Sequence, residues 1–114
     1  MSGIKVADIK SDMPTAEQAL RRVTAVLAAA RATGAAAVKI IHGWGSTGAG
    51  GRIRTEARRY LNEQCRKGKV RAVISGEDFS IFNEATLRAF ALCPELRRDS
   101  DLERHNNGVT IVVL

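Results

Sequence analysis

Apolar residues gather in four short runs along the chain, at residues 4–9, 38–41, 70–74 and 109–114. Runs of this length that are rich in valine and isoleucine are typical of β-strands. The last run is almost wholly apolar, which predicts a strand in the interior of a sheet. The first run carries an acid, Asp8, near its carboxyl end.

Between the first two runs, apolar residues recur every three or four positions, which predicts an amphipathic helix. Thr15 and Gln18 have the T-x-x-Q spacing of a capping box, in which each side chain bonds the backbone amide of the other residue at a helix start. Gly34 is expected to end this helix, because glycine readily takes the left-handed conformation of a C-terminal cap.

Two further segments predict helices. One runs from about residue 52 to residue 66 and stops at Gly68, and a shorter one covers residues 83–92 and is closed by Pro94. Residues 96–107 are mixed in charge and poor in apolar side chains, so an exposed loop is expected between the last helix and the last strand.

The order strand, helix, strand, helix, strand, short helix, strand predicts an α/β fold in which helices pack on a sheet. We expect the first crossovers to be right-handed and the strands that they join to be parallel. The chain has 114 residues and no internal repeat, so we expect a single domain over residues 1–114.

The charge of the chain is concentrated in one segment. The net charge is +6, and residues 52–71 hold eight basic residues against two acids, which accounts for the whole surplus. A strongly basic segment predicts attraction to polyanions. Aromatic residues make up only 4% of the chain, so the core is expected to consist mainly of alanine, valine, isoleucine and leucine.

The two cysteines, Cys65 and Cys93, lie far apart in the sequence and have no clustered histidines beside them. This spacing predicts neither a disulfide framework nor a zinc site, and no cofactor is expected. The chain has no apolar signal core and no apolar run of the ~20 residues that a membrane span needs. We therefore expect a cytoplasmic protein with no membrane partner; the sequence leaves its oligomeric state open.

Residues 42–51 form a glycine-rich segment between a predicted strand and a predicted helix, where backbone amides and the helix dipole favour phosphate. A P-loop is disfavoured because the lysine and hydroxyl pair of that motif is absent. Gly43, Gly45 and Gly48 satisfy the dinucleotide pattern G-x-G-x-x-G, but the acid expected at the end of the next strand is missing. A phosphate or nucleotide ligand therefore stays an alternative for this loop.

The run from Ile40 to Gly48, with Arg52-Ile-Arg54 at the start of the following helix, resembles the second signature of Smr domains, H-G-x-G-x-G-x-L-R. Smr domains are the module known from the C-terminus of MutS2 proteins. The T-x-E-Q-A-L start of the first helix, at residues 15–20, and the closing strand at residues 108–114 are also similar to the framework of that family.

The resemblance implies a two-layer α/β sandwich with a four-stranded mixed sheet, similar to the C-terminal domain of translation initiation factor 3. It also implies binding of DNA or RNA with low sequence preference, and nicking endonuclease activity in several members. The first signature, usually L-D-L-H-G, is degenerate here at residues 6–10, where Asp8 keeps the acid but Lys10 replaces the histidine. The nicking activity is therefore expected to be weak or lost, and a divalent metal is expected only if the chain is a nuclease.

Two residues are candidates for catalysis. His42 is suited to acid–base chemistry or to phosphate contact because the ordinary pKa of histidine lies near neutrality, and the alternative is a histidine fixed by hydrogen bonds at a strand end. Asp8 is a candidate to orient His42, and the alternative is a carboxylate that binds its own loop.

A larger set of residues is predicted to bind nucleic acid. For Trp44, stacking on a base and a ring folded back over the sheet edge are equally plausible. The arginines at positions 52, 59 and 66 form a helical stripe that is either a solvated face or a phosphate-binding one. The predicted set is Gly43, Trp44, Gly45, Gly48, Arg52, Arg54, Arg58 and Arg59. A protein-interaction or regulatory module, in which the basic helix docks on an acidic partner, is the alternative function.

Overall fold

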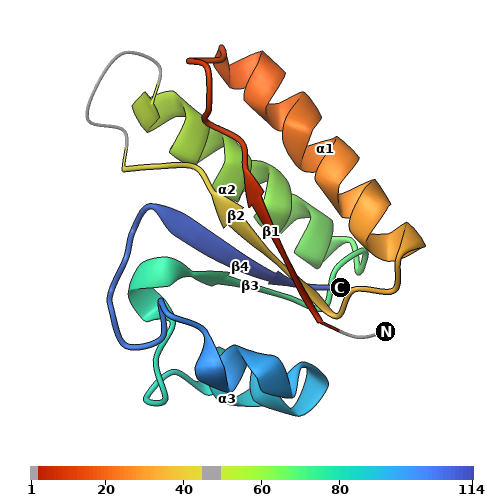
Figure 1. The fold of residues 1–114 in the computed structure, drawn as a ribbon, viewed down its shortest axis with the longest axis vertical. Coiled ribbons are helices and arrows are strands. Elements are labelled where there is room, and N and C mark those ends of the chain that lie inside the picture. The colour runs from red at the N-terminus through yellow and green to blue at the C-terminus, as the bar shows by residue number, and fades with distance from the viewer. Residues whose placement is uncertain (1–2, 45–49) are drawn as a thin grey trace.

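The computed structural model describes residues 3–44 and 50–114 (Figure 1). Four strands alternate with three helices along the chain, in the order that the hydrophobic pattern predicts. These elements are β1 (Ile4–Asp8), α1 (Ala16–Ala32), β2 (Ala37–Ile41), α2 (Gly50–Arg66), β3 (Ala72–Ser75), α3 (Glu84–Leu92) and β4 (Val109–Val113). Short 3-10 helices follow β3 at Gly76–Asp78 and follow α3 at Pro94–Arg98.

The strands form one mixed sheet in the order β1-β2-β4-β3. β1 and β2 are parallel, whereas β4 runs antiparallel to both β2 and β3. The carboxyl ends of β1, β2 and β3 therefore meet the amino end of β4 at one edge of the sheet. These findings confirm the α/β class, the four-stranded mixed sheet, and the parallel pairing expected for the first crossover.

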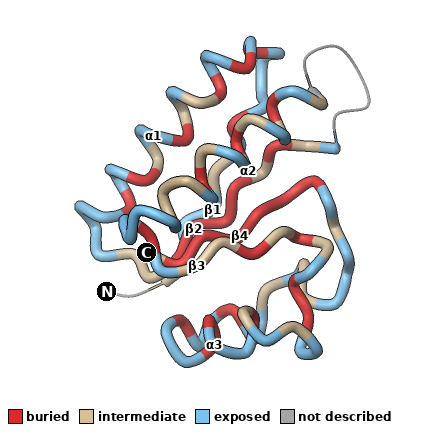
Figure 2. Tube along the Cα trace, turned by 180° about the vertical axis from the view of Figure 1, so that it is seen from behind, coloured by how far each residue is buried: buried red, intermediate tan, exposed pale blue. Residues whose placement is uncertain are grey.

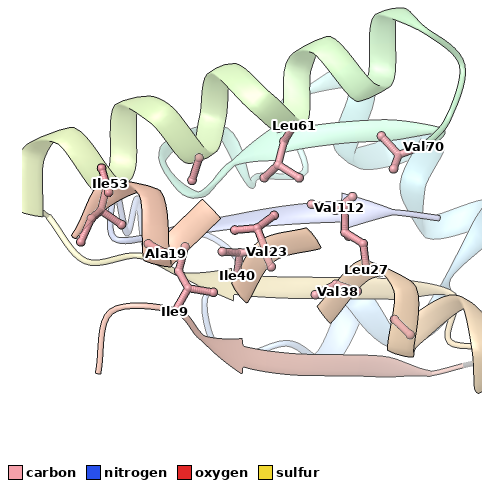
Figure 3. Close-up of a cluster of buried hydrophobic side chains, with 13 residues drawn as sticks. Ile9, Ala19, Val23, Leu27, Val38, Ile40, Ile53, Leu61, Val70 and Val112 are labelled. Carbon is pink, nitrogen blue, oxygen red and sulfur yellow. The ribbon is translucent and has the colours of Figure 1, made fainter. Parts of the chain in front are cut away.

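The larger core lies between one face of the sheet and helices α1 and α2 (Figure 3). Val38 and Ile40 of β2 point to this face because they are two residues apart on a strand. They pack with Val23 and Leu27 of α1 and with Leu61 of α2, which recur at helical spacing. Each of these side chains is fully buried, as the predicted stripe of α1 requires.

The opposite face of the sheet is covered by α3 and the 3-10 helix that follows it (Figures 1 and 2). Ile111 and Val113 of β4 and Ile74 of β3 pack there against Phe90 and Leu96. The two-layer arrangement is thus met by α1, α2 and the sheet, and α3 adds a smaller third layer. Leu96 begins the segment that was expected to be an exposed loop, yet it is fully buried because it completes this second core.

The capping box and the glycines in the sequence define the helix ends as predicted. The capping box of α1 is present, with the Gln18 amide donating to Thr15 Oγ1 at 3.1 Å and the Thr15 amide donating to Gln18 Oε1 at 2.9 Å. Gly34 and Gly68 follow α1 and α2 with positive φ angles of 74° and 76°. The predicted start of α2 at about residue 52 moves to Gly50, so the last two glycines of the loop are helical.

Lys39 stands inside β2 and is only 7% exposed. Its ammonium group pairs with Asp99, at 3.1 Å, and with Asp101. Burial alone would lower the pKa of Lys39, but the two carboxylates raise it, so the side chain stays charged. This pairing anchors the segment before β4 on the sheet and explains why a lysine is tolerated there.

Within residues 3–44 and 50–114, no helix combines the length and the apolar character that crossing a membrane requires.

Gly76 is expected to tolerate no side chain. A Cβ atom at this position would lie 1.9 Å from the carbonyl oxygen of Asn106 and 2.8 Å from that of Val109. We predict that Gly76→Ala lowers the free energy of unfolding by about 3 kcal/mol or more, because backbone must move. Gly68→Ala, with open space around its Cβ but a φ of 76°, is expected to cost only about 1 kcal/mol. Urea unfolding of both variants checks this order, and equal costs would contradict it.

Candidate nucleic-acid interface

The candidate site lies at the edge of the sheet where β1, β2 and β3 end and β4 begins. Three segments meet there: residues 42–44 after β2, the turn Gly76–Asp78 after β3, and residues 106–108 before β4. The amides of His42 and Gly43 both donate to the carbonyl oxygen of Gly108 at 3.0 Å, which ties the first segment to the third.

His42 is buried, with 1% of its surface exposed. Its Nδ1 lies 2.9 Å from the carbonyl oxygen of Gly43, and its Nε2 lies 2.8 Å from Thr110 Oγ1. Because a carbonyl oxygen can only accept, the geometry assigns the proton to Nδ1 and makes Nε2 the acceptor of the Thr110 hydroxyl. Both ring nitrogens of His42 are therefore used within the fold.

Arg58 of α2 reaches the same threonine from the helical layer. Its Nε donates to Thr110 Oγ1 at 3.0 Å, and its two terminal nitrogens donate to the carboxylate of Glu77 at 3.0 and 2.7 Å. One of these nitrogens also donates to the carbonyl oxygens of Asn107 and Val109. The guanidinium group is thus saturated by the fold, and the Arg58 side chain is only 17% exposed.

The surroundings of His42 keep its ring neutral. Burial lowers the pKa of His42 from 6.5 to about 4, and the positive charges of Arg58 and Arg54 act in the same direction. Burial would raise the pKa of Glu77, but the hydrogen bonds from Arg58 lower it, so the carboxylate is ionised. At neutral pH the cluster is a neutral imidazole beside an ion pair.

The Asp8 carboxylate binds the backbone of its own loop instead of His42. Its Oδ1 accepts from the amides of Lys10 and Ser11 at 2.8 and 3.1 Å, and its Oδ2 lies 3.6 Å from Lys10 Nζ. Burial opposes ionisation, but these bonds and the charge of Lys10 lower the pKa of Asp8. The methylene groups of Lys10 lie against Gly43, so the loop after β1 meets the glycine segment.

Gly43 has a φ of 78°, which glycine adopts readily, and a Cβ there would lie 2.9 Å from Cδ of Lys10. Its amide is already bound to Gly108, so it is not open to a phosphate. Gly45 and Gly48, the other glycines predicted to bind nucleic acid, lie outside the described residues.

Trp44 follows Gly43 and is 64% exposed. Its Nε1 donates to Asn106 Oδ1 at 3.0 Å, and the same edge of the indole lies against Gly108. The ring edge thus lies against the residue before β4 while most of the side chain faces solvent, and base stacking by Trp44 stays a prediction.

The arginines of α2 divide into two groups. Arg54 and Arg58 are four residues apart and project from the same side of the helix, and the charges of both act on His42 and Glu77. The arginines at positions 52, 59 and 66 lie on the exposed side, away from the buried Ala57 and Leu61. Arg59 pairs with Glu56 at 2.8 Å, and Arg66 pairs with Glu63.

Within the described residues, no group of three or more histidine, cysteine, aspartate or glutamate side chains is arranged to hold a metal ion.

Three residues of this cluster were not predicted from the sequence: Glu77, Thr110 and Asn106. Thr110 gives a usable signal, since a hydroxyl in an otherwise apolar buried strand needs a partner. Glu77 and Asn106 read as ordinary turn residues, and only the fold shows that they face Arg58 and Trp44.

Comparison with protein families places residues 12–79 in the Smr domain family. The match covers more than half of the chain, so the chain belongs to this family. Smr domains generally bind nucleic acid, and the family includes nicking endonucleases. The match begins at residue 12, after β1, which ends at Asp8, and after Lys10. No curated protein and no solved structure matches the chain significantly.

The low pKa of His42 predicts a pH-dependent stability. The pKa is about 4 in the folded protein and near 6.5 in the unfolded chain, so the unfolded chain binds more protons between these values. The stabilisation that the folded protein gains from neutral His42 is complete above pH 6.5 and is lost as the pH falls toward 4. We expect the free energy of unfolding to drop by about 2 kcal/mol between pH 7 and pH 5.

Denaturant unfolding at both pH values, in the wild type and in His42→Gln, checks this. The variant should be less stable at pH 7 but should lack the drop, because the carboxylates with lowered pKa act at lower pH. An equal drop in both proteins would contradict a buried neutral His42, as would an NMR titration midpoint of its ring near 6.5.

Proposed function

We propose that this Smr domain binds the phosphate backbone of DNA or RNA, with low sequence preference, at the sheet edge beside His42. The observation that carries the proposal is the charge that remains there after pairing. Arg58 is neutralised by Glu77 and Lys10 by Asp8, whereas Arg54 has no carboxylate within ion-pair distance in the described part of the chain. A guanidinium group without a carboxylate partner, beside the sheet edge, suits a phosphate.

The pairing pattern ranks the remaining arginines. Arg59 and Arg66 already pair with Glu56 and Glu63, so nearby carboxylates offset part of their charge. Arg58 serves the fold, and its replacement alters the edge itself. We therefore infer that Arg54 makes the main phosphate contact and that the exposed stripe adds a longer-range attraction.

Charge reversal tests this ranking. Arg54→Glu is expected to weaken binding of a labelled oligonucleotide about tenfold at low salt, for all sequences alike. Arg59→Glu should weaken it less, and Arg88→Glu, the same change on α3, is the control and should have little effect. Fluorescence anisotropy at several salt concentrations measures these affinities. Salt-independent binding, no binding at low salt, or equal effects of Arg54→Glu and Arg88→Glu would overturn the proposal.

For catalysis we propose that nicking activity is weak or lost. His42 and Asp8 stay the candidate residues, but a neutral His42 with both nitrogens bound has no free site for proton transfer. Asp8 is likewise occupied by the amides of its own loop.

A nicking assay decides between retained and lost nicking activity. Purified protein with supercoiled plasmid or structured RNA, with and without Mg²⁺, is expected to give no more cleavage than His42→Ala does. Cleavage that disappears in both His42→Ala and Asp8→Asn would overturn the loss of activity. Cleavage that is equal in all proteins identifies a contaminating nuclease.

A further inference from the structure

The indole of Trp44 is held in place although it is mostly exposed. An exposed tryptophan on a loop usually samples several rotamers, and a bound ligand must then select one of them. Here the hydrogen bond from Nε1 to Asn106 fixes the polar edge of the ring. The ring surface that stays accessible is therefore presented in one orientation before any ligand arrives.

Asn106 is itself held from three sides. Its Oδ1 accepts from Trp44 and from the amide of Gly108 at 2.9 Å, and its Nδ2 donates to Asp101 Oδ1 at 2.9 Å. Asp101 in turn pairs with Lys39, the buried lysine of β2. A chain of polar contacts thus links the indole to the interior of the sheet.

Gly108 provides the space that the ring edge needs. A Cβ at this position would lie 2.8 Å from Trp44 Nε1 and 2.9 Å from Trp44 Cδ1. The amides of His42 and Gly43 also bind the Gly108 carbonyl. The backbone that leads to Trp44 and the residue against which its ring rests are therefore one unit.

We propose that Trp44 is a stacking platform for an unpaired base of the bound nucleic acid, and that Asn106 is the residue that positions it. This inference rests on the proposed function and specifies its substrate class: single strands, or structured nucleic acids with a flipped or bulged base. Every base has a π-face, so stacking discriminates unpaired from paired bases without reading sequence.

The chemistry of the edge favours this class over a regular duplex. In a duplex, bases are already stacked on each other, and an exposed indole can reach only backbone or groove. Nucleotides with an unpaired base can place that base on the ring while their phosphates lie toward the basic start of α2. The Trp44 ring and Arg54 belong to segments that meet at the same sheet edge.

The chain contains a single tryptophan and a single tyrosine, so fluorescence excited selectively in the tryptophan band reports on Trp44 alone. We expect a single-stranded oligonucleotide to quench this fluorescence, and expect much less quenching by an abasic oligomer or a blunt duplex with the same number of phosphates. Anisotropy of labelled versions measures the binding of each probe independently. Trp44→Ala should lower affinity for the single strand about 5- to 100-fold, but should leave affinity for the abasic oligomer unchanged.

A double-mutant cycle tests the positioning role of Asn106. Asn106→Ala is expected to lower single-strand affinity about three- to tenfold in the wild type. In the Trp44→Phe background, where the ring remains but the Nε1 donor is gone, the same change should have no further effect. An effect of equal size in both backgrounds would show that Asn106 acts only on the fold, and would overturn its assignment.

The outcomes separate this inference from the proposed function. If the single strand and the abasic oligomer bind equally and Trp44→Ala changes neither affinity, stacking is wrong while backbone binding stands. If no probe binds at low salt, both are wrong. Selective quenching together with selective loss in Trp44→Ala supports the platform.

Discussion

The structure depends on the guanidinium group of Arg58. This single group joins α2 to the ends of three strands, through Thr110 of β4, the Glu77 turn after β3, and His42 after β2 by way of the threonine hydroxyl. A largely buried cation is tolerated only when its charge and its donors are matched, and here they are matched by a carboxylate, a hydroxyl and two carbonyl oxygens. Removal of one member leaves its direct partners without a hydrogen bond, so the group acts as a unit.

This arrangement separates the arginine whose charge stabilises the fold from the arginines whose charge a polyanion can reach. Arginines on the exposed side of a helix can attract polyanions but do not hold the backbone of the site in place. Arg59 and Arg66, which pair only with Glu56 and Glu63 of the same helix, are of this kind. A charge that is largely buried and fully paired fixes geometry but is closed to a ligand, as with Arg58. Arg54, one turn before Arg58, lies between these limits, since it is partly exposed and its charge is felt by His42 and Glu77. The neutral state of His42 follows first from its burial, and the positive charges of Arg58 and Arg54 add to the effect.

Much of the fold could be predicted because its signals are local. The capping box at Thr15, the glycines that end α1 and α2, and the short apolar run of β2 each depend on neighbours a few positions away, and each appears as expected. The site could be predicted less well because its contacts are distant in sequence. Arg58 meets its partners Glu77 and Thr110 at separations of 19 and 52 residues, so the sequence suggested a ligand contact for it and not these partners. The burial of Leu96 was not predicted for the same reason. Its segment is polar in composition, and only packing against the α3 layer buries it.

The same distant contacts explain why the edge can be rigid without being a regular element. Residues 42–44 and 106–108 have no strand or helix to hold them, yet their amides, the Asn106 side chain and the Trp44 indole satisfy one another. Asn106 is tied through Asp101 to Lys39, so the order extends into the sheet. A ligand that meets such an edge loses little free energy to ordering the protein, and more of its contact energy appears as affinity. Rigidity here therefore comes from the side chains that sequence patterns identify least well.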